Sequence, residues 1–299
     1  MKATYRILLI FHLYSMCVIL FNCTESPLFK QDEISNNTIK GRVELSDHSS
    51  PNNVYVWFKA LDISTRTDEN GCFKIQCPSP ASQPGGGVDG IFNIYFYIAN
   101  YRVDSVSVTI FNGNVKFSEG GLNSRGELAE LIVLSKILDV EASIDSVSIP
   151  VTQDTSGSHQ DTSYITFTVQ AIREPVTVTS SFSNSAFKGD PQFMTGFLKK
   201  IDSEQNFVKT IYREDRGHRT VHFEVNIHPV ELLPLRIILE PGMLPTGEYE
   251  VIPYLLIQQK NIPPGLINSL GENVEYFCPD FLNIPFKVEN NRFRVFADE

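Results

Sequence analysis

The stretch Thr65–Ile75, TRTDENGCFKI, decides the fold, since it reads as two strand-forming runs joined by a tight turn. Asn70 and Gly71 tolerate the positive φ that such a turn requires. The carboxylate of Asp68 can accept hydrogen bonds from the turn amides that follow it. Phe73 and the isoleucine two positions later point to one face of a strand. The stretch therefore predicts a β-hairpin whose second strand enters a hydrophobic core.

The acidic turn has a second interpretation, a loop that binds calcium. An EF-hand loop spreads oxygen ligands over twelve residues and ends in a glutamate. Here Gly71 is followed at once by Cys-Phe-Lys-Ile-Gln, so the series of ligands stops. We expect Asp68, Asn70 and Gly71 to form a structural turn.

Further strand-forming runs surround this stretch from residue 38 to residue 138. Val106 and Val108 alternate with serines, which is the period-2 pattern of a half-buried strand. The run 90–99 is apolar on both faces, which predicts a central strand. A helix is conceivable at 124–138, although Leu131–Leu134 could equally form a final strand. The expected strands cover residues 39–45, 53–61, 64–67, 72–77, 90–99 and 103–111, with turn residues between them.

An ordered series of short motifs runs through this region: Ile39-Lys40-Gly41-Arg42-Val43, Asn53–Val56, Thr65–Ile75, Ala99-Asn100-Tyr101 and Val106–Ile110. The series resembles the carboxypeptidase regulatory-like domain and covers about a third of the chain. The resemblance implies a transthyretin-like, seven-stranded β-sandwich, which often serves as an accessory domain on peptidases, transporters and surface proteins. Asn100 stands where the family commonly has glycine, and the loop 78–90 is longer than the usual connection.

The second half of the chain, residues 139–299, is also rich in strands. Ile165 to Ala171 alternate apolar and polar residues, and so do Val221 to Ile227. Strands of this length with ordinary spacers suggest a β-sandwich of Ig-like type. The sequence therefore predicts an all-β chain of two β-sandwich domains, 38–138 and 139–299, with the boundary near residue 139.

The N-terminal residues have the composition of an export signal. Lys2 and Arg6 precede an apolar run that ends at Phe21, the pattern of a signal peptide. Cys23 follows this run as in a lipobox, although Asn22 stands where a smaller residue is usual. We expect a lipoprotein-type signal at 1–22, a lipidated Cys23 and a flexible tether at 23–37. An uncleaved signal anchor is the alternative. A lipid on Cys23 would hold the protein at a membrane of the cell envelope, without defining the leaflet.

The other cysteines allow at most one disulfide bond. Cys17 lies within the predicted signal, which leaves Cys72, Cys77 and Cys278. Cys72 and Cys77 are five residues apart on one expected strand and should point to opposite faces. A bond from either of them to Cys278 is possible, and buried free thiols are the simpler expectation.

Composition and motifs argue against nucleic-acid binding and catalysis. The net charge of −10 does not suit a partner that carries phosphates. The sequence contains no G-x-S-x-G, H-E-x-x-H or P-loop motif. His228 and Glu231 have the local spacing of a metallocarboxypeptidase, but no histidine follows them. We expect a non-enzymatic protein without a cofactor.

Two further kinds of site stay open at this point. His218, His222, Glu224 and His228 share the polar parity of one expected strand and could hold a metal ion. The opposite parity is apolar, so the same residues also fit the solvent face of a sandwich.

Aromatic residues in the first half, Trp57, Tyr95 and Tyr97, could stack on sugars. Aromatic residues inside nearly continuous apolar runs more often belong to the core, and this is the interpretation we prefer for all three. The preferred hypothesis is a binding or spacer module at the cell envelope with a protein or glycan partner; the alternatives are a carbohydrate-binding accessory protein and a metal-dependent factor.

Overall fold

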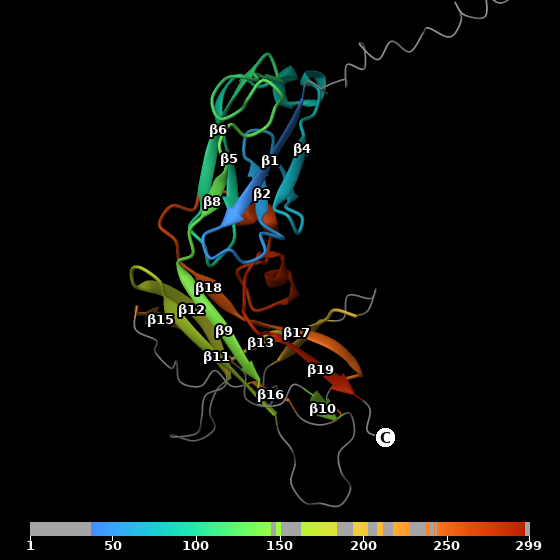
Figure 1. The fold of residues 1–299 in the computed structure, drawn as a ribbon, viewed down its shortest axis with the longest axis vertical. Coiled ribbons are helices and arrows are strands. Elements are labelled where there is room, and N and C mark those ends of the chain that lie inside the picture. The colour runs from blue at the N-terminus through green and yellow to red at the C-terminus, as the bar shows by residue number, and fades with distance from the viewer. Residues whose placement is uncertain are drawn as a thin grey trace, which may run out of the picture.

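The computed structural model describes residues 37–144, 148–150, 163–183, 194–202, 208–211, 218–227, 237–239, 242 and 244–296. These residues form strands and four short 3-10 helices, with no α-helix among them. Two β-sandwiches follow one another along the long axis of the molecule (Figure 1). The prediction of an all-β chain with two β-sandwich domains is confirmed.

The first sandwich packs a three-stranded sheet against a five-stranded sheet. The rings of Phe73 and Phe96, one from each sheet, meet edge-on at 5.6 Å between centroids. The small sheet has the order β4 (Cys72–Gln76), β1 (Thr38–Leu45), β8 (Ile132–Leu134), and the large one β3 (Ile63–Arg66), β2 (Tyr55–Phe58), β5 (Gly90–Tyr97), β6 (Asp104–Phe111), β7 (Asn114–Val115).

The second sandwich contains the remaining strands. Its core runs from Leu138 to Val295, whereas the core of the first sandwich runs from Ile39 to Leu134. Its sheets are β16 (Ile237–Leu239), β11 (Ser163–Ala171), β9 (Leu138–Ile144); β15 (His218–Val225), β12 (Val176–Ser183), β18 (Leu255–Ile257); and β10 (Ser148–Pro150), β19 (Arg292–Phe296), β17 (Gly247–Pro253), β13 (Gly196–Lys200), β14 (Val208–Ile211).

The turn at Asp68 has tight local geometry. One carboxylate oxygen of Asp68 accepts the amides of Asn70 and Cys72, both at 2.9 Å. Gly71 has φ +77°, and a Cβ there would lie 2.1 Å from the carbonyl oxygen of Val43. No other residue fits this position without moving the β1 backbone.

The prediction that this turn closes a β-hairpin is wrong. β3 pairs with β2 and β4 pairs with β1, so the turn joins strands of opposite sheets. The chain bends at the buried Thr67, whose hydroxyl donates to the carbonyl of Pro51 at 2.5 Å and accepts the amide of Val54 at 2.8 Å. These bonds end β3 and direct the chain across the sandwich.

Several other expectations can be compared with the structure. Residues 132–134 form the strand β8, and no helix is present between 124 and 138. Cys72 is exposed, Cys77 is buried and all three described cysteines are free, so the expectation of buried thiols holds for Cys77 only. The strands β13 and β14 have no counterpart in the sequence-based prediction.

An apolar contact joins the two sandwiches. Tyr55, Trp57 and Tyr97 lie on the outer face of the five-stranded sheet and are each at most 4% exposed. The segment 258–291, between β18 and β19, covers them (Figure 1). We call this cluster the aromatic joint; its buried members are Tyr55, Trp57, Tyr97, Ala99, Phe197, Tyr254, Leu266, Leu270, Val274, Phe281 and Ile284.

Polar atoms of the aromatic joint are also satisfied. The hydroxyl of Tyr55 donates to the carbonyl of Ser269 at 3.1 Å, and that of Tyr254 donates to the carbonyl of Glu275 at 2.7 Å. The indole of Trp57 donates to Asp62 at 3.0 Å. Buried tyrosine and tryptophan are stable when their polar ends find partners in this way. The second half of β5 is therefore covered on both faces, as its apolar sequence indicated, whereas Ile91 near its start is 72% exposed.

Removal of Phe281 should weaken the joint. Its ring stacks on Phe197 at 5.5 Å between centroids and is 1% exposed. Phe281→Ala leaves a cavity and should lower the free energy of unfolding by about 3–5 kcal/mol in urea denaturation. The matched control Phe111→Ala, at a ring that is 55% exposed, should cost less than about 1 kcal/mol. Equal effects of the two substitutions would contradict this assignment.

Candidate functional site

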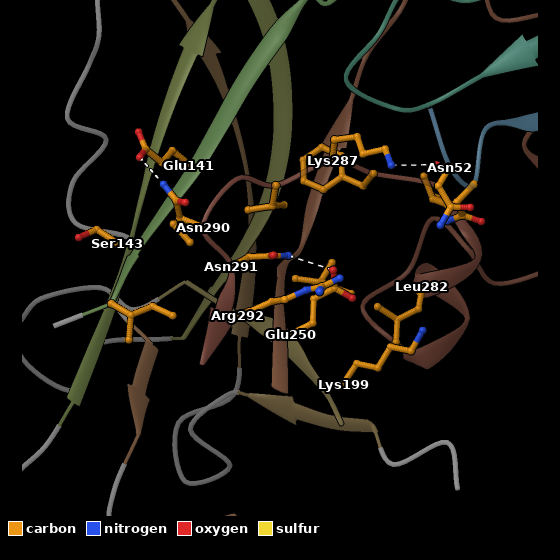
Figure 2. A pocket seen from close by; sticks show the side chains of 17 residues that line it. Asn52, Glu141, Ser143, Lys199, Glu250, Leu282, Lys287, Asn290, Asn291 and Arg292 are labelled. Atoms are coloured by element: carbon orange, nitrogen blue, oxygen red, sulfur yellow. Dashed lines mark hydrogen bonds between the residues drawn. The ribbon is translucent and has the colours of Figure 1, made fainter. Parts of the chain in front are cut away.

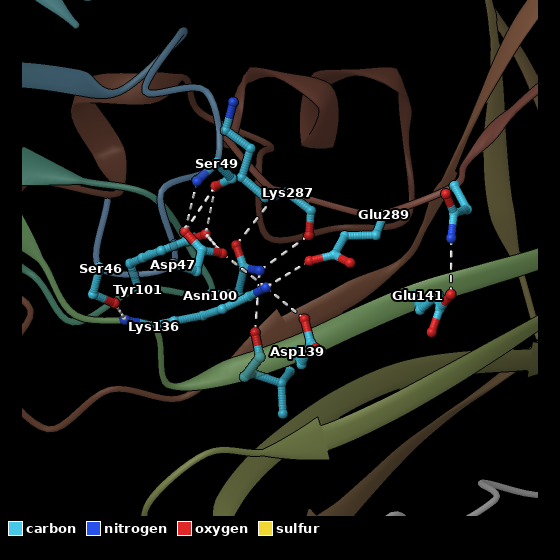
Figure 3. A network of polar contacts seen from close by, with 12 residues as sticks. Ser46, Asp47, Ser49, Asn100, Tyr101, Lys136, Asp139, Glu141, Lys287 and Glu289 are labelled. Carbon is cyan, nitrogen blue, oxygen red and sulfur yellow. Dashed lines mark hydrogen bonds and ion pairs between the residues drawn. The ribbon is translucent and has the colours of Figure 1, made fainter. Parts of the chain in front are cut away.

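A second, polar contact lies beside the aromatic joint and centres on Lys136. Its ammonium group lies 2.9 Å from Asp47, 2.5 Å from Asp139 and 2.9 Å from Glu289, and its side chain is 10% exposed (Figure 3). The hydroxyl of the buried Tyr101 donates to the other side of this cluster, at Asp47, over 2.7 Å. We call this cluster the polar joint. It links a loop of the first sandwich to β9 and to the segment before β19.

Asn100 completes the connection. It is fully buried, and its side-chain amide donates to the carbonyls of Leu138 and Lys287 at 3.2 and 3.0 Å. Its side-chain oxygen accepts the amide of Lys287 at 3.1 Å. Gln259 adds bonds from its side chain to the carbonyls of Ala99 and Tyr101. Asn100 thus helps to tie the two sandwiches together.

The charges of the polar joint support one another. Burial by itself would raise the pKa of Asp47, but hydrogen bonds from Tyr101, Lys136 and Ser49 outweigh it and lower the pKa to about 2. Burial opposes the charge on Lys136, and its three carboxylate partners still raise the pKa of the ammonium group. Tyr101 has a raised pKa through burial and the adjacent Asp47.

A cleft of about 1090 Å³ opens next to the two joints. The loop at Asn52 and Asn53 forms one wall, the edge of β9 another, and strands β13, β17 and β19 the floor (Figure 2). Seven lining residues are apolar, among them Phe286. The ten polar lining residues are Asn52, Asn53, Glu141, Ser143, Lys199, Glu250, Lys287, Asn290, Asn291 and Arg292.

Several polar groups of the cleft are held in place by hydrogen bonds. The side-chain amide of Asn290 donates to Glu141 at 2.8 Å. The amide of Asn291 is shared between Glu250 at 3.3 Å and the carbonyl of Val251 at 3.2 Å (Figure 2). Four amides, three cations, two carboxylates and a hydroxyl thus present donors and acceptors to one space.

Two cations, Lys287 at the cleft wall and Arg66 outside the cleft, are partly removed from water. Burial lowers the pKa of Lys287, although Glu250 and Asp47 oppose the shift. Its ammonium group donates to the carbonyl of Asn52 at 2.8 Å. Outside the cleft, burial also lowers the pKa of Arg66, whose guanidinium donates to Asn53 at 2.8 Å and to the carbonyl of Asn283 at 2.6 Å. These bonds fix the loop at Asn52 and Asn53 against the segment 258–291.

The residues predicted from the sequence as sites lie elsewhere. Asp68, Asn70 and Gly71 form the turn already described, on the first sandwich. His222 pairs across β12–β15 with Thr179, and its Nδ1 lies 2.7 Å from the threonine hydroxyl. Glu224 is exposed on the same strand.

The other predicted positions are only partly described. His218 begins β15, whereas Cys23, His228 and Glu231 lie outside the described residues. Among the residues that the structure describes, no three histidine, cysteine, aspartate or glutamate side chains are grouped as metal ligands. The described part of the chain also has no helix of the length and hydrophobicity that crossing a membrane requires.

Of the two interpretations of Trp57, Tyr95 and Tyr97, core packing is confirmed and the sugar-stacking platform is excluded. Trp57 and Tyr97 are buried in the aromatic joint, and Tyr95 is half-buried and packs against that cluster. The cleft itself was missed, because its walls come from residues that are far apart in the sequence. Its one local signal is the run Glu289-Asn290-Asn291-Arg292, which is polar where a strand begins.

Comparisons with known proteins add little to this description. No protein-family model matches the chain, and no curated protein sequence matches it. A solved structure of a candidate carbohydrate binding protein from Bacteroides uniformis is 10% identical, with 76% of this chain and 92% of that chain covered and a TM-score of 0.30. Shaft pilin SpaA from Lactobacillus rhamnosus GG is 10% identical, with 77% and 89% covered and a TM-score of 0.27. At these scores no function is transferred from either protein.

Acid should weaken the polar joint through Asp47. The pKa of its carboxyl is about 2 in the folded state and about 3.9 in an unfolded chain. Above about pH 5 both states are ionised and the stabilisation is complete; between about pH 5 and 2 the unfolded state takes up the proton first, so stability is lost. Asp47→Asn should therefore be less stable than the wild type at pH 6 and should lose less stability between about pH 5 and 2. Parallel curves of unfolding free energy against pH would contradict this.

Proposed function

We propose that this chain is a non-catalytic binding module of the cell envelope, held at a membrane by a lipid on Cys23, whose interdomain cleft binds a saccharide. The observation that carries the proposal is the concentration of ten polar lining residues in one cleft of about 1090 Å³. Such a cleft has the size of a ligand site, in which a few placed polar groups fix orientation.

The chemistry of the lining favours a ligand with many hydroxyl groups. Each hydroxyl both donates and accepts a hydrogen bond, and side-chain amides offer both functions at once. Asn52, Asn53, Asn290 and Asn291 supply four amides at the cleft, and Glu141 and Glu250 supply acceptors. Phe286 and Leu282 add apolar area on which the carbon face of a sugar can pack.

The direction of the chain suits an anchored module. β1 begins at Thr38 at the end of the first sandwich that lies away from the second sandwich (Figure 1). A lipid on Cys23 would therefore attach at that end, with the tether 23–37 between. The cleft would then face away from the membrane, where it can meet a glycan or protein partner. A rigid pair of sandwiches would also serve as a spacer.

We also propose that the first sandwich belongs to the carboxypeptidase regulatory-like group. Its two sheets enclose Phe73, as the motif T-x-T-D-x-N-G-x-F predicts. Gly41 lies so close to Leu128 and Phe73 that an added Cβ would be 2.6 and 2.7 Å from them. This explains why the motif has glycine at that position. An accessory role of this kind is compatible with a binding module.

Binding can be tested by filling the cleft. Purified chain with Cys23→Ser should bind members of a glycan array, and Ser143→Trp should abolish this binding because Ser143 lines the cleft from the exposed side of β9. Ser105→Trp, at an exposed position of β6, is the matched control and should bind normally. A silent array, or equal binding by the two tryptophan variants, would contradict the proposal.

The anchor has a direct test of its own. Cells that express the wild type should carry the protein in the membrane fraction, whereas Cys23→Ser should release it, because the thiol that receives the lipid is removed. Cys17→Ser, which leaves Cys23 intact, should fractionate like the wild type. Membrane association of Cys23→Ser would show that another element holds the protein.

A further inference from the structure

Three charged side chains form a row across the floor of the cleft. Lys199 on β13 lies directly opposite Glu250 on β17, and Glu250 lies directly opposite Arg292 on β19. Residues paired in this way have their Cβ atoms about 4.5–5.5 Å apart and point to the same face. All three line the cleft, as Figure 2 shows. The row therefore places two cations around a single carboxylate.

The two carboxylates of the cleft already have donors, whereas two of its cations have no acceptor within the described part of the chain. Glu141 and Glu250 accept hydrogen bonds from Asn290 and Asn291. Among the described residues, no hydrogen bond or ion pair engages the ammonium group of Lys199 or the guanidinium of Arg292. The hydrogen-bonding capacity that remains in the cleft is thus mainly that of positive donors.

A third cation of the cleft, Lys287, also favours an anionic ligand. Lys287 uses its ammonium group on the carbonyl of Asn52 at 2.8 Å, which leaves two of its three protons for other acceptors. Burial disfavours its charge and lowers its pKa. An anion in the cleft would offset this loss of hydration. The cations of the cleft outnumber its carboxylates by three to two, in a chain whose net charge is −10.

We infer that the cleft binds a saccharide that carries an anionic group, a carboxylate or a sulfate, and that Arg292 and Lys199 contact this group. The inference rests on the proposed function, since the amides of the cleft bind the hydroxyls of the same ligand. Arg292 presents a planar fork of donors that matches a carboxylate or sulfate with two parallel hydrogen bonds. Lys199 adds a second positive charge from the other side of Glu250.

The cleft suits a saccharide better than an acidic peptide. Extended peptides bind by adding a strand to a free sheet edge, with pockets for alternate side chains. The floor of the cleft is instead the face of three paired strands, and β17 is hydrogen-bonded on both sides by β13 and β19. Side chains, not backbone edges, are what the floor offers to a ligand. The edge of β9 at the wall is already hydrogen-bonded to the backbone of Glu289, at Val140 and Ala142.

The test compares ligands of equal length and different charge by titration calorimetry of the full chain with Cys23→Ser. The probes are galacturonic acid hexamer for a carboxylate, κ-carrageenan hexamer for a sulfate, cellohexaose as a neutral saccharide, and hexaglutamate as an acidic peptide. We expect at least one acidic saccharide to bind at least about tenfold more tightly than cellohexaose. Arg292→Gln should weaken this binding about ten- to hundredfold, since a hydrogen bond to a charged group is lost, and should leave cellohexaose unchanged.

The matched control is Arg294→Gln. Arg294 lies on the same strand and the same face, but its guanidinium pairs with Glu248 and it does not line the cleft. Arg294→Gln should therefore bind acidic saccharides like the wild type. Lys199→Gln should weaken binding in the same sense as Arg292→Gln, and Lys74→Gln, at an exposed site on β4, should not.

Each contrary outcome has a defined meaning. If cellohexaose binds as tightly as the acidic saccharides and Arg292→Gln has no effect, the inference is wrong and the proposed function stands. If Arg294→Gln and Arg292→Gln weaken binding equally, total charge and not the row accounts for the preference, and the inference is also wrong. If hexaglutamate binds more tightly than every saccharide, the ligand is an acidic peptide and the inference is wrong. If no saccharide binds, the proposed function itself is overturned.

Discussion

The burial of Tyr55, Trp57 and Tyr97 beneath the segment 258–291 is the contact on which the rest of this structure depends. Without that segment, the outer face of the first sandwich would present a large aromatic patch to water, which soluble proteins rarely do. The segment belongs to the second sandwich, so the hydrophobic effect that covers the patch also fixes one sandwich against the other. The polar joint around Lys136 and the cleft form at the edge of this contact.

The path of the segment 258–291 explains how the cleft forms. The segment 258–291 leaves the aromatic joint and returns to the sheet at β19, and on the way it carries Lys287, Asn290 and Asn291. The same short stretch supplies Glu289 to the polar joint. Interdomain adhesion and the polar lining are therefore built from one piece of chain, and domain contacts are common places for ligand sites.

The sequence predicted the parts whose signal is local. The alternation in Ile165–Ala171 gave a strand whose four apolar side chains are fully buried, and the apolar run 90–99 indicated burial on both faces. What covers the second face was not predictable, because residues 258–291 have no strand periodicity and reach β5 from far along the chain. The prediction of a hairpin at Asp68 was wrong for a related reason. A turn motif defines only its own backbone geometry, whereas the partners of the flanking strands are β2 for β3 and β1 for β4.

The cleft combines residues near 52, 141, 199, 250 and 290, and no local pattern in the sequence brings these together. The sequence showed only that Asn100 stands where the resembled family pattern commonly has glycine. Its role follows from its hydrogen bonds to Leu138 and Lys287, which lie far along the chain.

The central claim is that the two sandwiches form one rigid body. It can be tested by pulsed dipolar electron resonance between spin labels on the exposed Cys72 and on Thr220→Cys, with Cys17, Cys23 and Cys278 replaced by serine and Cys77 protected by burial. The aromatic and polar joints predict a single narrow distribution of distances, which Phe281→Ala should broaden. A broad or two-peaked distribution in the parent protein would contradict the account, since the cleft would then have no fixed shape.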